Sequence, residues 1–369
     1  MIFKKKNIIS TGSLSSLAWK KFKKNLLGFG SLVFIGIVIL IACLGYLITP
    51  DSTPYANNQY LELGLKKPGF TVIMLPVKQN RVKTGQAFFK TMISGKIGNV
   101  QNIPIRAYTV KNNHIMYIEY GALPGDVSMV KILPLSEIDI PVKKTFWVGT
   151  DRFGRDYLSQ LMIGTRVSLS VGLISVLISL VIGIFIGAIG GYYRGWVDNF
   201  IMWLINVVWS IPTLLLVIAI TFALGKGFWQ VFIAVGLTMW VEVARVVRGQ
   251  ILSIRESEYV EAARALGFSD FRIIFRHILP NAMAAVIVIS AANFASAILM
   301  EAGLSFLGLG VQPPVPSWGS MIKENYGYLV LDYAYLAILP GIAIMLMVLA
   351  FMLMGNALRD ALDVRMSEV

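Results

Sequence analysis

The sequence has 369 residues, of which 56 % are hydrophobic and 14 % are charged, against the roughly 25 % charged residues usual in soluble domains. Several apolar runs are longer than about 18 residues, so we expect an integral membrane protein. The net charge of +13 is better explained by basic loops on the inner side of a membrane than by nucleic-acid binding. A single cysteine, Cys43, excludes an intrachain disulfide, and two histidines are too few for a His-rich metal site.

The first apolar run covers residues 26–48 and follows a basic segment, residues 1–25, with seven lysines and no acidic residue. A signal peptide would have a shorter apolar core and a small-residue cleavage site after it. We therefore expect an uncleaved transmembrane helix at 26–48. Because positive charge stays on the cytoplasmic side, the N-terminus is expected in the cytoplasm.

Residues 49–146 differ in composition from the rest of the chain. Three stretches, 70–77, 103–110 and 114–120, are rich in β-branched and aromatic residues. Residues 111–113 separate the last two and predict a hairpin turn. We expect a small, mostly β extracytoplasmic insertion, for which the sequence indicates no function.

Further spans are predicted in the remaining part of the chain, each long enough to cross about 30 Å of hydrocarbon. They cover residues 167–191, 199–224, 228–246, 283–308 and 334–356. The expected fold is thus an all-α polytopic membrane protein of about six transmembrane helices. An even number of crossings returns the C-terminus to the cytoplasm.

Two sequence features modify these spans. Gly183 and Gly187 have the spacing that lets membrane helices approach closely, with packing inside the chain as the expected use. Pro212 lacks a backbone donor and should kink the third span.

The charged stretch between the fourth and fifth spans predicts a cytoplasmic helix–turn–helix. Tyr259, Ala262, Ala263 and Leu266 share the rhythm of one helical face, and Gly267 follows where a C-cap is needed. A second helix would begin after an N-cap at Ser269 and bend into the fifth span at Pro280 and Asn281. Such a hairpin would either lie on lipid headgroups or dock in a protein groove. Its small residues favour a groove.

The sequence "EAARALGFSDFRIIFRHILP" resembles the EAA loop of permease subunits of binding-protein-dependent ABC importers. The matching residues are Glu261, Ala262, Ala263, Gly267, Leu279 and Pro280. His277 departs from the general pattern, which has isoleucine there. The resemblance implies a five-helix permease core over residues 147–369 with a cytoplasmic coupling loop at 247–281.

A second stretch, "GTDRFGRDYLSQLMIGTRVSLSVG" at residues 149–172, is similar to the segment before the second span in the C-type permease of dipeptide, oligopeptide and nickel importers. Its motif residues are Gly149, Asp151, Gly154, Arg155 and Asp156. Asp151 with Arg155, and Arg152 with Asp156, have the i, i+4 spacing of ion pairs on a juxtamembrane helix. The resemblance does not extend to residues 50–146.

The resemblance implies a subunit of the bacterial inner membrane with several partners. These are a homologous B-type permease that completes a heterodimer, two cytoplasmic P-loop ATPases and an extracytoplasmic substrate-binding protein. The coupling residues it implies are Tyr259, Glu261, Ala262, Ala263, Leu266, Gly267, Leu279 and Pro280. ATP and magnesium would be bound by the ATPases, and the chain has no P-loop pattern of its own. Peptides are the expected cargo on family frequency, although similar subunits carry nickel chelates and other small solutes.

Other classes of function are weighed against the importer. An ion-coupled secondary transporter or channel would place charged residues deep in several spans, which here are nearly free of them. A membrane enzyme would need a cluster of titratable or metal-binding residues, and we predict neither a catalytic nor a metal-binding residue. Glu242 and Glu301 lie near predicted span ends, where structural or capping roles are favoured over a functional one.

Overall fold

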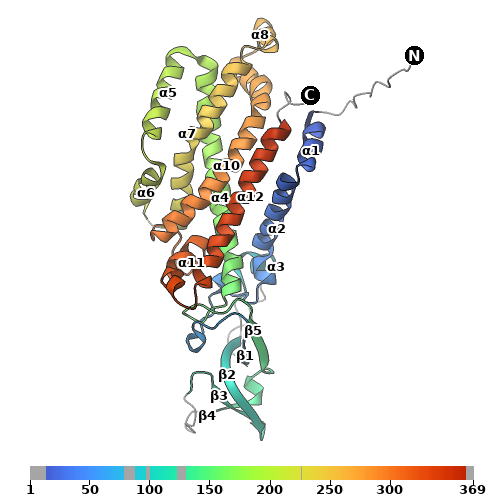
Figure 1. The fold of residues 1–369 in the computed structure, drawn as a ribbon, viewed down its shortest axis with the longest axis vertical. Helices are drawn as coiled ribbons and strands as arrows, with labels where there is room; N and C mark the ends of the chain where they lie inside the picture. Colours follow the sequence, from blue (N-terminus) through green and yellow to red (C-terminus); the bar gives the residue numbers. More distant parts are fainter. Residues whose placement is uncertain (1–13, 79–87, 97–99, 123–129, 226, 363–369) are drawn as a thin grey trace, which may run out of the picture.

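The computed structural model describes residues 14–78, 88–96, 100–122, 130–225 and 227–362. A bundle of long helices occupies most of the length of the molecule, and a small β-sheet lies at one end (Figure 1). The helices of the bundle are α1 (Leu14–Lys24), α2 (Leu26–Ile48), α4 (Tyr157–Tyr193), α5 (Gly195–Trp209), α6 (Thr213–Leu224), α7 (Phe228–Ile254), α10 (Leu279–Phe306) and α12 (Tyr335–Leu362). Shorter helices are α3 (Phe88–Ser94), α8 (Glu258–Ala265), α9 (Asp270–Arg272) and α11 (Trp318–Asn325).

Within the described residues, five helices are long and apolar enough to cross a membrane, which agrees with the predicted fold class. The predicted span at 199–224 is wrong as a single helix, because it consists of α5 and α6, bent by 88° at their junction. Pro212 is therefore the site of a break, sharper than the expected kink. The second span also begins earlier than predicted, at Tyr157, because the Asp156 side chain caps the helix there.

Helices α4 and α7 pack closely through the two glycines singled out in the sequence. A Cβ atom on Gly183 would lie 2.5 Å from Val243 Cβ, and one on Gly187 would lie 2.5 Å from the Ala244 carbonyl oxygen. Ordinary carbon contacts are about 3.5–4.0 Å, so only glycine allows this approach. The expected use of the pair in packing inside the chain is confirmed.

The sheet is antiparallel with strand order β4-β3-β2-β1-β5. Its strands are β1 (Phe70–Lys78), β2 (Val100–Lys111), β3 (His114–Glu119), β4 (Val130–Pro134) and β5 (Val142–Phe146). The predicted hairpin is confirmed: Lys111 pairs with His114, and Asn112 and Asn113 between them have φ of 49° and 60°. Two positive φ values are those of a type I′ turn, which asparagine tolerates. The strands β4 and β5 and the short helix α3 were not predicted.

The two ends of the molecule differ in character (Figure 1). Helix α8, the beginning of α1 and the end of α12 lie at one end, whereas the sheet lies at the other. The described part of the chain thus starts and finishes at the same end of the bundle, as expected for six crossings if the bent α5–α6 pair counts as one span.

Candidate functional site

Helix α8 is held against the bundle by two side chains. Val260 is fully buried and Ala263 is 4 % exposed, and both belong to a core cluster with Val247 and Ile251 of α7 and with Ile273. The other six residues of α8 are exposed. The helix is therefore anchored along one side and presents the remainder of its surface at the end of the molecule.

Gly267 ends α8 as the sequence predicted. Its φ is +73°, the Phe268 N–H donates to the Ala263 carbonyl at 3.2 Å, and the Gly267 N–H donates to the Arg264 carbonyl at 2.9 Å. These two bonds form a Schellman motif, which satisfies carbonyls that the helix end leaves open. The left-handed conformation costs glycine little, so this residue suits the turn that carries the chain to α9.

An apolar surface lies on and beside α8, and we call it the α8 cap. Leu266 and Phe271 are 73 % and 71 % exposed, Tyr259 and Phe275 are about 45 % exposed, and Ala262 is exposed between them. The Phe271 and Phe275 rings are in contact, with centroids 4.4 Å apart and planes tilted by 36°. Exposed apolar patches of this kind mark interaction surfaces.

The coupling residues implied by the resemblance divide into two groups in the structure. Tyr259, Glu261, Ala262, Leu266, Gly267 and Pro280 are exposed. Ala263 is buried and Leu279 is partly buried, so these two support the loop from inside.

The loop is also fastened to the end of α4 by polar contacts. The Tyr192 hydroxyl donates to Asp270 at 2.7 Å, and the Arg264 and Arg255 guanidinium groups lie 5.3 and 5.6 Å from the Tyr192 ring centroid. Asn281 donates to the Tyr259 hydroxyl at 3.0 Å. These contacts fasten α8 and α9 to the bundle.

The predicted bend at Pro280 and Asn281 is wrong. Residues Asp270–Phe306 form one continuous helix, in which a π-helical segment at Ile273–Ile278 precedes the proline. Proline lacks an N–H and clashes with the carbonyl four residues before it. A wider π turn before the proline accommodates it without ending the helix, and Leu279 accordingly donates to Ile274, five residues back. Ser269 occupies the N-cap position as expected, but its side chain makes no capping bond.

The second motif forms a compact loop at the opposite end of the bundle. Asp151 is buried and accepts hydrogen bonds from the Phe153 N–H at 2.9 Å, the Arg155 N–H at 2.9 Å and the Arg155 Nε at 2.6 Å. Arg155 also donates to Glu324 of α11 at 2.9 Å. The Arg155 guanidinium group thus binds the carboxylates of both Asp151 and Glu324, and it links the loop to α11.

The expectation of a juxtamembrane helix at this motif is wrong, although the Asp151–Arg155 ion pair exists. Gly149 and Gly154 have φ of +80° and +71°, which a helix does not allow, and the chain turns at both. Arg152 forms no ion pair with Asp156 and instead stacks over the Phe153 ring at 4.5 Å. Asp156 accepts from the Ser159 N–H at 2.9 Å and caps α4, and its burial raises the pKa of its carboxyl.

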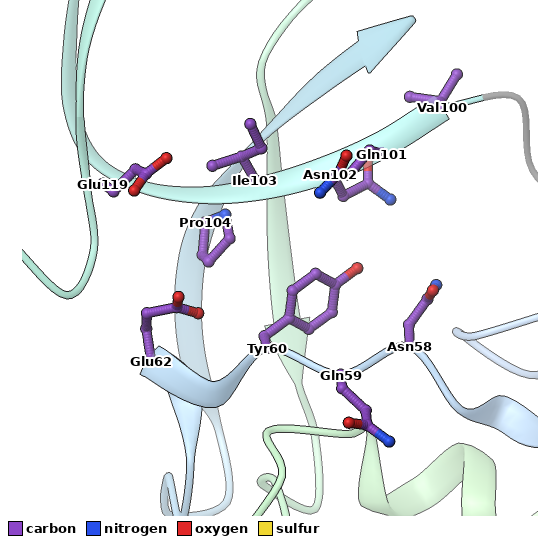
Figure 2. A pocket seen from close by; sticks show the side chains of 10 residues that line it. All are labelled: Asn58, Gln59, Tyr60, Glu62, Val100, Gln101, Asn102, Ile103, Pro104 and Glu119. Atoms are coloured by element: carbon purple, nitrogen blue, oxygen red, sulfur yellow. The ribbon is translucent and has the colours of Figure 1, made fainter. Parts of the chain in front are cut away.

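A polar cavity of about 340 Å³ lies in the sheet-bearing part of the chain (Figure 2). Asn58, Tyr60 and Glu62 point into it from one side, and residues 100–104 of β2 line the other side. Burial raises the pKa of Tyr60 to about 12, so its hydroxyl is neutral at physiological pH. The cavity is small and open, and its walls carry more amides than charges.

The two acidic residues noted near span ends have different surroundings. Glu301 is fully buried and accepts hydrogen bonds from Ser305 at 2.7 Å and Ser168 at 3.2 Å, so it joins α10 to α4. Glu242 is exposed near the middle of α7. In the described parts of the chain, no group of three or more His, Cys, Asp or Glu residues is arranged to hold a metal ion.

The comparisons with known proteins give one consistent result. Residues 168–368 match the family model described as "binding-protein-dependent transport system inner membrane component". Residues 13–68 match the N-terminal transmembrane domain of oligopeptide transport permease C. Neither model covers residues 69–167, which include the whole sheet.

Individual relatives agree with these family models. The chain is 43 % identical over 217 residues to the glutathione transport system permease protein GsiD of Pectobacterium atrosepticum, covering 59 % of this chain and 72 % of the relative. It is 41 % identical over 278 residues to the dipeptide transport system permease protein DppC of Alkalihalophilus pseudofirmus, covering 75 % of this chain and 89 % of the relative. A solved inward-facing structure of the MetNI methionine ABC transporter aligns at a TM-score of 0.46 with 19 % identity, covering 55 % of this chain and 95 % of that one. The chain therefore belongs to the binding-protein-dependent transport system inner membrane component family and is a multi-pass C-type permease subunit of an ABC importer.

Proposed function

We propose that this permease subunit imports short peptides and that the α8 cap transmits the movement of partner ATPases to the helical bundle. The observation that carries the coupling role is the exposed apolar surface on a helix that Val260 and Ala263 anchor at one end of the bundle. The dipeptide and glutathione systems to which its relatives belong support peptides as cargo.

The shape of α8 favours a protein groove over a lipid surface. The exposed residues Ala262, Ala265 and Gly267 are small and bury little area in lipid, but they allow a facing surface to approach closely. Leu266, Tyr259 and Phe271 stand around them and would enter hydrophobic pockets of the groove. An amphipathic helix laid in an apolar groove is a common mode of recognition.

The orientation of the bundle follows from charge. Helix α1 lies at the end of the molecule that carries α8, and it contains four lysines: Lys20, Lys21, Lys23 and Lys24. Because basic residues stay on the cytoplasmic side, we place this end, and with it both termini, in the cytoplasm. The sheet then lies outside, where an extracytoplasmic binding protein would deliver the cargo.

The remaining partners follow from the same proposal. A homologous B-type permease would complete a heterodimer, and two cytoplasmic P-loop ATPases would bind ATP and magnesium, so this chain itself needs no cofactor. An ion-coupled transporter that works without an ATPase is the competing function.

The test compares two tryptophan variants of the tagged protein, purified in mild detergent with whatever remains bound. Ala262→Trp enlarges the centre of the α8 cap, whereas Leu61→Trp enlarges a side chain that is 69 % exposed near the sheet. We expect mass spectrometry to find a P-loop ATPase and a second permease with wild type and with Leu61→Trp, and only the second permease with Ala262→Trp. If an ATPase binds all three proteins equally, the α8 cap is not its docking site. The alternative that the α8 cap lies on lipid headgroups would then be favoured. Its absence from all three, in monodisperse samples, would favour an ion-coupled transporter.

A further inference from the structure

The break between α5 and α6 exposes irregular backbone at the depth of the membrane. Residues 210–213 are all exposed, and Pro212 has no N–H to donate. Non-helical backbone is tolerated at such depth only where protein buries it or where it lines a water-filled space. The described part of this chain does not bury it, so water or a partner subunit must meet this face.

An unpaired carboxylate lies beside the break. Glu242 is exposed near the middle of α7 (Phe228–Ile254), roughly 20 Å from either end of the helix at 1.5 Å per residue. Among the described residues it has neither an ion-pair partner nor a hydrogen-bond partner. A carboxylate turned toward hydrocarbon is costly and rarely found, so we take this face of α7 not to be lipid-exposed in the working protein.

The positively charged side chain of Arg245 lies near the same place. The Arg245 guanidinium lies 3.7 Å from the Trp209 ring centroid at the end of α5, and its Nη2 donates to Asn206 at 3.5 Å. Arg245 is therefore committed to α5 and does not pair with Glu242, although the two are one helical turn apart. The result is a fixed positive group and a free negative group on one mid-membrane face.

A small cavity lies next to both the α5–α6 break and Glu242. It has a volume of about 80 Å³ and lies between the break and helices α7 and α10. The polar residues that line it are Thr213, Thr238, Glu242 and Ser296. At about 30 Å³ per molecule it holds two or three waters, which is too small for a solute but sufficient to hydrate a carboxylate.

We propose that Glu242, at the α5–α6 break, lines the aqueous passage and binds the positively charged amino group of the transported solute. Glu242 is an exposed carboxylate on this face of α7. The neighbouring cavity can hold water that hydrates it. Arg245 contacts α5 through Trp209 and so holds that helix beside the cavity. This assignment rests on the proposed import of peptides, whose free amino termini are cationic.

The first experiment tests exposure to water and needs no substrate. In a Cys43→Ser background, Glu242→Cys and Val181→Cys are each reacted with a cationic, membrane-impermeant methanethiosulfonate in the complex reconstituted in liposomes. Val181 is 71 % exposed on an apolar stripe of α4, so it serves as the lipid-facing control. Because only a hydrated thiol ionises, we expect residue 242 to react at least about tenfold faster than residue 181. Equal rates would overturn the proposal even if peptide import is established.

The second experiment tests the amino group. Glu242→Gln is expected to raise KM about tenfold for a dipeptide with a free amino terminus, with little change in kcat, as loss of one charge-assisted hydrogen bond predicts. The N-acetylated dipeptide should show the same KM in wild type and variant. An unchanged KM for the free dipeptide, together with rapid labelling at residue 242, would overturn the role in binding the amino group. It would indicate instead that Glu242 contacts the second permease. If wild type carries no peptide at all, the proposed cargo fails, and the labelling rates still decide whether Glu242 faces water.

Discussion

The close packing of α4 on α7 makes a quantitative prediction about two glycines. Replacing Gly187 by alanine places a Cβ atom 2.5 Å from the Ala244 carbonyl oxygen and 3.0 Å from Val247 Cβ. The carbonyl belongs to the α7 backbone and cannot rotate away, so the helices must separate by roughly 1 Å at this point. Gly183→Ala meets Val243 Cβ at 2.5 Å and the Trp240 carbonyl oxygen at 2.7 Å.

The expected cost follows from these contacts. Overpacking of one methyl group destabilises a well-packed interface by about 1–3 kcal/mol, whereas alanine is favoured over glycine in a helix by up to about 1 kcal/mol. Each variant should therefore lose about 1–2 kcal/mol of unfolding free energy. Because one displacement of the helices relieves both clashes, the double variant should cost less than the sum of the single variants.

The assay is the midpoint of unfolding in a detergent series, with Gly36→Ala as the matched control. Gly36 lies inside α2, and a Cβ atom there would meet nothing within 4 Å, so this variant should be as stable as wild type or slightly more stable. The reasoning is refuted if Gly187→Ala and Gly36→Ala shift the midpoint in the same direction by similar amounts.

Three further predictions concern the sheet-bearing end of the molecule. Arg155→Leu leaves the buried carboxylate of Asp151 without its counter-charge and should cost about 3–5 kcal/mol of stability, measurable as a lower unfolding midpoint; a loss below 1 kcal/mol would mean that solvent reaches the carboxylate. Because burial raises the folded-state pKa of Asp156, its contribution to stability is present below the unfolded pKa and is lost as pH rises through the folded value. Asp156→Asn keeps a capping acceptor without the charge, so its stability advantage over wild type should shrink as pH is lowered from 7.5 to 4.5, and a constant advantage would contradict the pKa shift. Asn113→Gly should stabilise the hairpin by less than about 1 kcal/mol and so slow its cleavage in limited proteolysis. Asn113→Val should speed cleavage, because valine resists a positive φ.

The long helices were predictable because a run of apolar residues has few alternatives in a membrane. The hairpin was also predictable, since Asn112 and Asn113 stand between two strand-like segments. Both signals are local, and local signals are what a single sequence contains.

The errors arose where local signals pointed the wrong way. The spacing of Asp151 and Arg155 is that of a helical pair, but two glycines with positive φ fold the segment into a loop. Pro280 looks like a helix boundary until the preceding π turn is known. The strand β5, with sequence VKKTF, has too few apolar residues to show alternation.

Other features depend on residues distant in the sequence. The bond from Arg155 to Glu324 joins residues 169 positions apart, and no pattern near either residue predicts it. The sequence placed Glu242 near a span end, and only the fold shows that it lies beside the α5–α6 break. The buried side of α8 was likewise invisible, so Ala263 was grouped with the exposed Ala262.

The helix that runs without interruption from Asp270 to Phe306 has a mechanical consequence. Its 37 residues span about 55 Å, so the α8 cap at one end and Glu301 near the other are joined by a single rod. A tilt of about 10° about the middle of such a rod moves each end by about 5 Å, in opposite directions. A push at the α8 end would thus reach the opposite end of the bundle as an equal and opposite displacement, and the π-helical segment at Ile273–Ile278 is where the rod could bend and absorb it.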